Sequence, residues 1–171
     1  MRIILFRHGP AGERDPEQWP DDRLRPLTPK GIERTRRAAR GLLRLEGRPR
    51  VVLTSPLERC VRTARILAAE ARLDGGVEML DALAPRASWR DVLRRLAEER
   101  ADASIALVGH EPDLGKLAGV LLFGAPHALP IKKAGACSIE FEDTVTPGAG
   151  RLRWFLHPRA LAGIRPSGSK V

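Results

Sequence analysis

Residues 2–9 read Arg-Ile-Ile-Leu-Phe-Arg-His-Gly, and this stretch decides the fold class. Its four consecutive apolar residues are typical of a strand that is buried on both faces, as the strands of parallel sheets are. Residues 51–53 and 105–108 are apolar runs of the same kind. Segments with helical spacing lie between these runs, so strands and helices alternate. The pattern predicts an α/β fold, a three-layer sandwich in which a mostly parallel sheet carries helices on both faces.

Capping signals predict where the helices begin. Thr28 and Pro29 are typical of an N-cap and a first helical residue. Residues 55–58, Ser-Pro-Leu-Glu, have the pattern of a capping box. Further helices are predicted after Ser88 and from about residue 112 to 122, and residues 9–26 read as a long loop. Three more strands are predicted over residues 77–80, 136–142 and 151–157, the last two antiparallel.

Length and composition are those of one globular domain. The chain has 171 residues, of which 43% are hydrophobic and 30% charged. We expect one domain over residues 1–165 and a loose tail over 166–171. No apolar run is long enough to span a membrane, and residues 3–6 are too few for the core of a signal peptide, so a cytoplasmic location is expected. The two cysteines form neither a disulfide framework nor a zinc site.

The net charge of +9 is concentrated in the first part of the chain. Residues 1–72 hold 17 Lys and Arg against 9 Asp and Glu, whereas residues 73–171 hold 13 against 12. This distribution predicts a basic face that attracts anionic partners. Nucleic acid is an unlikely partner for it, because aromatic residues make up only 4% of the chain and tyrosine is absent, which leaves few platforms for stacking bases.

Charged and nucleophilic side chains follow three of the predicted strands. Arg7, His8 and Gly9 follow the first strand, Arg59 lies in the first turn of the helix after the second, and His110 follows the strand over 105–108. Open parallel sheets bind ligands beyond the carboxyl ends of their strands. The sequence therefore predicts that two arginines and two histidines meet at one edge of the sheet.

This set of residues suits a phosphoryl group. The planar fork of arginine matches phosphate oxygens and stays charged, and phosphoryl transfer needs mainly positioning and charge stabilisation. A neutral imidazole nitrogen is a competent nucleophile, so His8 is the expected covalent acceptor. Gly9 has no side chain and leaves room for phosphate. No acidic residue at these strand ends completes a metal site, so neither metal nor other cofactor is expected.

Three motifs resemble those of the histidine phosphatase superfamily, also called the phosphoglycerate mutase-like family. Residues 6–9 resemble its Arg-His-Gly signature, residues 55–64 its second motif with an arginine after Ser-Pro, and residues 108–110 its third. The resemblance implies a phosphoglycerate mutase-like fold. It also implies that His8 is phosphorylated during turnover and that Arg7, Arg59 and His110 hold the phosphate.

Two shorter stretches and the short chain look most like the SixA group of phosphohistidine phosphatases. These stretches are residues 25–28, which add Arg25 as a phosphate contact, and residues 83–85. Many superfamily members carry a carboxylate after the third strand as the acid for the leaving group, but Ala82 occupies that position here. Asp81 is a possible substitute. A histidine-phosphorylated signalling protein is therefore the expected substrate.

Other functions remain open. One alternative is a small-molecule phosphomonoesterase of the same superfamily, and a less favoured one is a non-catalytic module that binds phosphate or nucleic acid. A cysteine-dependent phosphatase is excluded, because that chemistry needs an arginine six residues after the cysteine and Cys60 has Ile66 there. Ser55 is assigned to capping a helix. The sequence leaves the oligomeric state undetermined.

Overall fold

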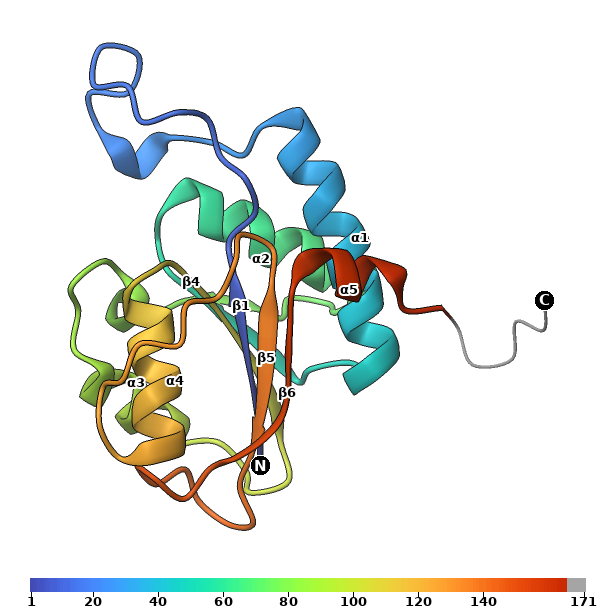
Figure 1. Ribbon diagram of the computed structural model, residues 1–171, viewed down its shortest axis with the longest axis vertical. Helices are drawn as coiled ribbons and strands as arrows, with labels where there is room; N and C mark the ends of the chain where they lie inside the picture. Colours follow the sequence, from blue (N-terminus) through green and yellow to red (C-terminus); the bar gives the residue numbers. More distant parts are fainter. Residues whose placement is uncertain (166–171) are drawn as a thin grey trace.

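The apolar runs form the centre of a six-stranded sheet in the computed structural model, which describes residues 1–165 (Figure 1). The strands are ordered β3-β2-β4-β1-β5-β6. Their bounds are β1 Arg2–Arg7, β2 Val51–Thr54, β3 Val77–Met79, β4 Ser104–Gly109, β5 Ala136–Glu140 and β6 Arg151–Leu156. β1, β2, β3 and β4 are mutually parallel, β5 is antiparallel to β1, and β6 is antiparallel to β5. The predicted α/β class with a mostly parallel sheet is confirmed.

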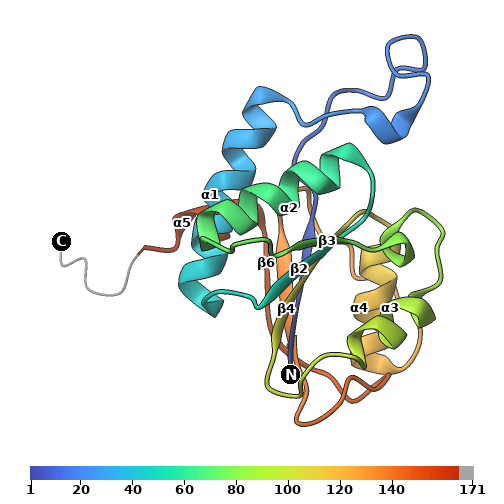
Figure 2. The same ribbon diagram turned by 180° about the vertical axis from the view of Figure 1, so that it is seen from behind.

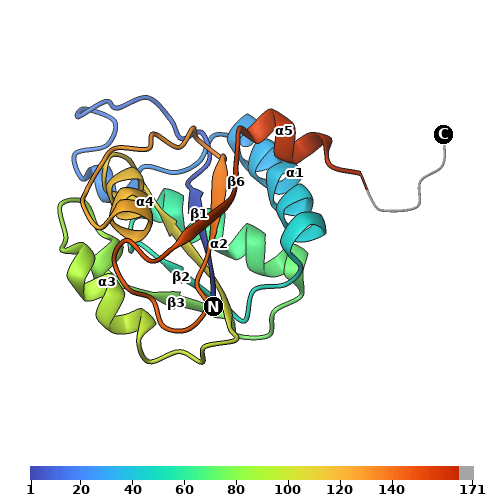
Figure 3. The same cartoon turned by 60° about the horizontal axis from the view of Figure 1, so that its bottom comes forward.

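Helices cover both faces of this sheet (Figures 2 and 3). The helices are α1 Pro29–Glu46, α2 Glu58–Ala71, α3 Trp89–Leu96, α4 Asp113–Phe123 and α5 Pro158–Gly163, with short 3-10 turns η1 Asp22–Leu24 and η2 Asp81–Leu83. Successive side chains of a strand point to opposite faces. Ile4 and Phe6 accordingly pack with α1, α2 and α5, whereas Ile3 and Leu5 pack with α3 and α4. Both faces of β1 are thereby buried, and the three-layer arrangement is confirmed.

The N-terminal caps predicted for α1 and α3 are confirmed, and the one predicted for α2 is wrong. The Thr28 hydroxyl accepts from the Gly31 N–H at the start of α1, and the Ser88 side chain caps α3. The expected capping box at residues 55–58 does not form. Leu57 is the N-cap of α2, and it has no side chain that could accept a hydrogen bond there. The Ser55 hydroxyl instead lies 3.2 Å from Nε2 of His110, the residue that follows the neighbouring strand β4.

Two points concern the C-terminal part of the chain. The short helix α5 was not predicted, because six residues are too few to show helical periodicity. The tail expected over residues 166–171 lies outside the described residues. Within residues 1–165, no helix combines the length and the apolar character that crossing a membrane requires.

Candidate active site

Parallel pairing brings His8 and His110 to the same edge of the sheet. β1 and β4 are neighbours with Arg7 opposite Gly109, so each strand delivers its histidine one residue later. The His8 N–H donates to the Gly109 carbonyl at 3.0 Å, and the two imidazole ring centres lie 6.2 Å apart. Arg59 reaches this edge from the first turn of α2. The structure thus brings together Arg7, His8, Arg59 and His110, as the sequence predicted.

The His8 ring is held in one orientation. Its Nδ1 lies 2.7 Å from the Gly9 carbonyl oxygen, which can only accept, so Nδ1 carries the proton and Nε2 keeps its lone pair. Burial chiefly, with Arg59, Arg7 and His110 adding repulsion, lowers the pKa of His8 to about 3. The imidazole is therefore neutral near pH 7, which is the form that attacks an electrophile.

We expect this shift to appear in the pH dependence of folding. His8 stays neutral in the folded chain between its ordinary pKa of 6.5 and about 3, but the unfolded chain takes up the proton in that window. Acidification then favours unfolding, by roughly 1 kcal/mol per pH unit. From pH 6 to pH 4, the free energy of unfolding should fall more steeply in the wild type than in His8→Asn, as denaturant titrations would measure. Parallel pH profiles of the two proteins would contradict the shift.

Gly9 allows α1 to pack closely against the loop that follows β1. A Cβ atom at this position would lie 2.0 Å from the Thr35 hydroxyl of α1, so no larger residue fits. The Gly9 N–H donates to the Thr63 hydroxyl of α2 at 3.1 Å. This amide is therefore engaged within the protein. The room at Gly9 is taken by α1, which differs from the expectation that it admits phosphate.

Both site arginines have unused hydrogen-bond donors. Arg7 donates from Nη1 to the Ile131 carbonyl at 2.8 Å, and Arg59 donates from Nη1 to the Asp22 carbonyl at 2.8 Å. The Nε atoms of both arginines are buried without a partner among the described residues. A buried unpaired donor is costly, most of all on a charged group. The two orphaned donors therefore mark a place where the oxygens of an anion would be favourable.

Asp22 is a site residue that the sequence reading missed. Its carboxylate accepts from Arg59 Nη2 at 3.0 Å and from Arg25 Nε at 2.7 Å. Arg25 first, and then Arg59, hold the pKa of this carboxyl below its usual range, so it is ionised. Arg25 also donates to the Gly12 carbonyl. The structure thus uses Nε and Nη1 of Arg25 to hold the loop and Asp22, and the expected contact of Arg25 with phosphate stays a prediction.

An anion bound at Arg59 would compete with the Asp22 carboxylate for the Arg59 guanidinium. We expect Asp22→Asn to bind inorganic phosphate about threefold to tenfold more tightly, because it removes a negative charge and can keep the backbone contact to Arg59. Isothermal titration with phosphate would measure this. Asp21→Asn is the matched control, since Asp21 pairs with Arg23 in the same loop. Weaker binding by Asp22→Asn would instead mean that the carboxylate is needed to position Arg59.

His110 is oriented by two neighbouring segments. Its Nε2 lies 3.0 Å from the Leu83 carbonyl of η2 and 3.2 Å from the Ser55 hydroxyl. Because the carbonyl can only accept, Nε2 carries the proton. Burial chiefly, and then Arg59, lower the pKa of His110. The ring is therefore neutral before an anion binds, and its Nδ1, 4.0 Å from the Cys60 sulfur, is the nitrogen that can take up a further proton.

Two more charged residues, Glu111 and Lys133, lie near Arg7. The Glu111 carboxylate accepts from the Ile131 N–H at 3.2 Å, and the carbonyl of Ile131 accepts from Arg7, so Glu111 helps to position Arg7. Burial raises the pKa of Glu111. Burial, with Arg7 and the other site arginines, lowers the pKa of Lys133, which places this ammonium group in the same basic surroundings. Glu111 directly follows His110 in the chain, whereas no sequence pattern marks Lys133.

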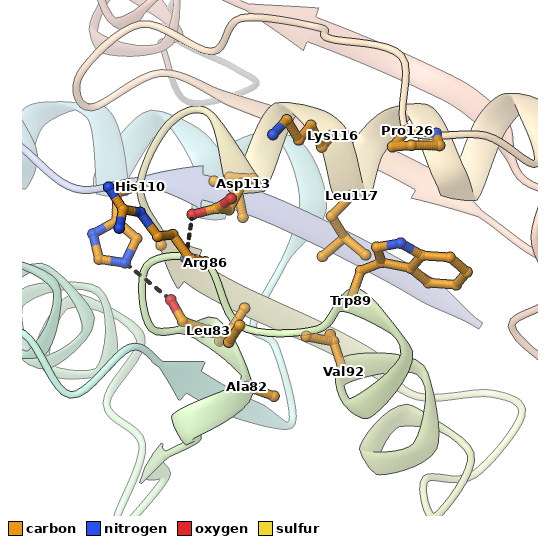
Figure 4. Close-up of a pocket in the computed structure, with 13 residues that line it drawn as sticks. Ala82, Leu83, Arg86, Trp89, Val92, His110, Asp113, Lys116, Leu117 and Pro126 are labelled. Carbon is orange, nitrogen blue, oxygen red and sulfur yellow. Dashed lines mark hydrogen bonds between the residues drawn. The ribbon is translucent and has the colours of Figure 1, made fainter.

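Asp81, the candidate acid predicted from the sequence, does not line the cavity that contains His110. Ala82 lines a cavity of about 430 Å³ together with His110 and Asp113 (Figure 4). Asp81 is exposed and lines a separate hollow with Arg94 and Arg95. The carboxylate of Asp113 faces the His110 cavity and accepts from the Arg86 N–H at 3.0 Å. Within residues 1–165, no cluster of three or more potential ligand residues could hold a metal ion.

The fold and the site together define an α/β protein in which two arginines and two histidines meet at the carboxyl edge of a mostly parallel sheet. Comparison with family models finds the histidine phosphatase superfamily (branch 1) over residues 3–84. An uncharacterized protein of Picosynechococcus is 44% identical over 156 residues, which cover 90% of this chain and 89% of that protein.

Solved structures agree with the family match. The protein histidine phosphatase SixA complexed with tungstate superposes with a TM-score of 0.80 at 26% identity, covering 94% of this chain and 99% of that one. A phosphoserine phosphatase of Entamoeba histolytica shares the fold, with a TM-score of 0.66 at 17% identity over 92% of this chain and 98% of that one. The chain belongs to the histidine phosphatase superfamily.

Proposed function

We propose that this phosphatase hydrolyses phosphohistidine on a protein, through a phosphohistidine intermediate on His8 and without a metal ion. The observation that carries the proposal is the His8 ring: its Nδ1 proton is held by Gly9, its Nε2 is free, and its pKa is lowered to about 3. The unpaired Nε atoms of Arg7 and Arg59 beside it supply charge for the phosphoryl oxygens. The similar SixA structure holds tungstate, another tetrahedral oxyanion.

The reaction follows in two displacements. In the first, Nε2 of His8 forms a bond to phosphorus while the P–N bond to the substrate imidazole breaks, and that imidazole takes a proton from water. In the second, water attacks the phosphoryl group, the bond to His8 breaks, one proton of this water neutralises the hydroxide left by the first step, and the phosphate leaves as hydrogen phosphate. Arg7 and Arg59 stabilise charge on the phosphoryl oxygens in both steps. A dianionic phosphate favours protonation of His110, whose Nδ1 then becomes a further donor.

The acids near the pocket support phosphohistidine as the substrate. An alkoxide is a poor leaving group and needs a proton donor, which typically contributes roughly a hundred- to ten-thousand-fold in rate. Ala82 stands where other family members carry that acid, Asp22 is held ionised, and Glu111 is engaged by the Ile131 N–H. Imidazole leaves readily without such help. A P–N substrate therefore fits these residues better than an alkyl phosphate.

One residue favours a second candidate function, a small-molecule phosphomonoesterase. Asp113 presents a carboxylate to the cavity that contains His110, and this group is the remaining candidate for an acid. The same fold also carries phosphoserine hydrolysis in a relative. A non-catalytic binding module is less favoured, because binding alone does not need a buried neutral imidazole with a free nitrogen.

The test is a comparison of kcat/KM values. We expect a histidine-phosphorylated protein to exceed phosphoserine and sugar phosphates by at least about a hundredfold, with aryl phosphate in between because its leaving group needs little help. Efficient hydrolysis of alkyl phosphates that is lost in Asp113→Asn or Asp81→Ala would overturn this substrate class. We also propose a role in cytoplasmic signalling, which depends on a histidine-phosphorylated signalling protein being the substrate.

We also expect chelation to leave turnover unchanged. The phosphoryl charge meets arginines in this pocket, and the described residues offer no cluster of metal ligands. Activity measured before and after incubation with EDTA and dialysis should agree within error. Loss of activity that returns on adding Mg²⁺, Mn²⁺ or Zn²⁺ would show that a metal takes part.

A further inference from the structure

The 430 Å³ cavity beside His110 extends well beyond the space that a phosphate needs. It runs between α3 and α4, with His110 at one end and Trp89 and Pro126 at the other (Figure 4). Its volume lies in the range of ligand pockets, roughly 300–1,000 Å³. The cavity begins at His110, whose ring centre lies 6.2 Å from that of His8, so a group next to the leaving imidazole of a substrate could enter it.

The middle of this cavity, between the two helices, is apolar. Leu83, Val92, Leu114 and Leu117 line it between the two helices, and Trp89 closes its outer end. The Asp113 carboxylate is already engaged by the Arg86 N–H. Polar groups of a sugar or hydroxy-acid substrate that face these leucine and valine side chains would stay unpaired, which costs free energy. An apolar side chain would be favoured there by burial of its surface.

The rim of the cavity is basic. Arg86 and Lys116 line the cavity, and the Arg90 guanidinium lies 4.4 Å from the centre of the ring of Trp89, which lines it too. These three cations are exposed and take part in no ion pair within residues 1–165. Carboxylates on a partner can therefore pair with these three cations without displacing an internal partner. Charge of this kind at a rim favours acidic partners and speeds their association.

We propose that the α3–α4 cavity is the docking site for the protein substrate: it receives an apolar side chain that lies next to the phosphohistidine on an acidic surface of that protein. This inference rests on the proposed function and adds to it the surface that recognises the partner. The apolar walls bind the inserted side chain, the basic rim pairs with the flanking carboxylates, and His110 marks where the phosphoryl group enters the active site.

The experiment compares two substrates that share the same P–N bond. One is free phosphohistidine, and the other is an acidic carrier protein phosphorylated on one surface histidine with phosphoramidate. Arg90→Glu/Lys116→Glu should lower kcat/KM for the carrier at least about tenfold, mostly through KM, and change kcat/KM for free phosphohistidine less than about twofold. Trp89→Ala should have the same signature. The matched control is Arg34→Glu/Arg62→Glu, which makes the same charge change at exposed positions of α1 and α2 on the other face of the sheet.

Each other outcome is decisive. Equal losses on both substrates, or an equal loss in the control, would overturn the docking site while the phosphohistidine phosphatase function stands. Loss of small aryl phosphate turnover in Trp89→Ala would assign the cavity to small molecules instead. Failure of the wild type to hydrolyse either P–N substrate would overturn the proposed function, and the docking site with it.

Discussion

We expect His8→Ala to abolish turnover and the proposed covalent intermediate together. The variant lacks Nε2 of His8, the unprotonated nitrogen that the contact between Nδ1 and the Gly9 carbonyl leaves available for attack. Removing a nucleophile from a group of residues that act together costs about ten-thousand-fold or more in kcat. Steady-state assays of the wild type and the variant would measure the loss. His127→Ala is the control, because His127 is an exposed histidine outside this pocket.

The intermediate itself is expected to be visible in the wild type. Stopping the reaction in denaturant with phosphorus-labelled substrate should leave label on the protein that is stable in base and lost in acid, as a P–N bond is. Mass spectrometry should place it on His8. Acid-stable label on a serine such as Ser55, or label retained by His8→Ala, would contradict the mechanism.

Arg59→Ala is expected to have the second largest effect. Arg59 is only 5% exposed and has a buried Nε without a partner, so it stands ready to contact a phosphoryl oxygen. Losing one such donor costs about 3 kcal/mol of transition-state stabilisation, which is more than a hundredfold in kcat/KM. Arg59→Lys should recover little of it, because an ammonium group lacks the planar fork. The control is Arg62→Ala, an exposed arginine on the same helix.

Folding has to be measured alongside this variant. Arg59 also holds Asp22, so its loss leaves a loop carboxylate with Arg25 as its remaining partner. If circular dichroism and the unfolding midpoint match the wild type while kcat/KM falls, the effect belongs to the site. Full activity in Arg59→Ala would remove this residue from the catalytic machinery.

Local patterns in the chain were enough to predict the fold class. The strands β1, β2 and β4 each contain an uninterrupted apolar run, because a strand covered on both faces needs apolar side chains in both directions. The side chains of Thr28 and Ser88 accept hydrogen bonds from amides of their own helices, and Pro29 follows Thr28 as the first helical residue. Their roles can therefore be predicted from neighbouring residues in the sequence. Ser55 shows the limit of this reasoning: its hydroxyl meets His110, which lies 55 residues away in the chain.

The residues around the arginines were beyond local patterns for the same reason. Asp22 is one of several acidic residues in a long loop, and only folding of that loop over α2 brings it to Arg59. Lys133 lies in a segment without periodicity, and its proximity to Arg7 follows from hydrogen bonds of the Ala134 N–H to the carbonyls of Arg7 and His8. Glu111 acts on Arg7 only through the backbone of Ile131.

The sequence by itself determined which strand ends carry Arg7, His8 and His110, because the position of a residue after an apolar run is a local property and parallel strands end at a common edge. Only the tertiary structure decided the chemical state of those residues. The free nitrogen of His8 depends on the Gly9 carbonyl and on burial, and the availability of Arg59 depends on a carboxylate from another loop. Charge, protonation and access arise from neighbours that are distant in the chain, so they exist only once the chain has folded.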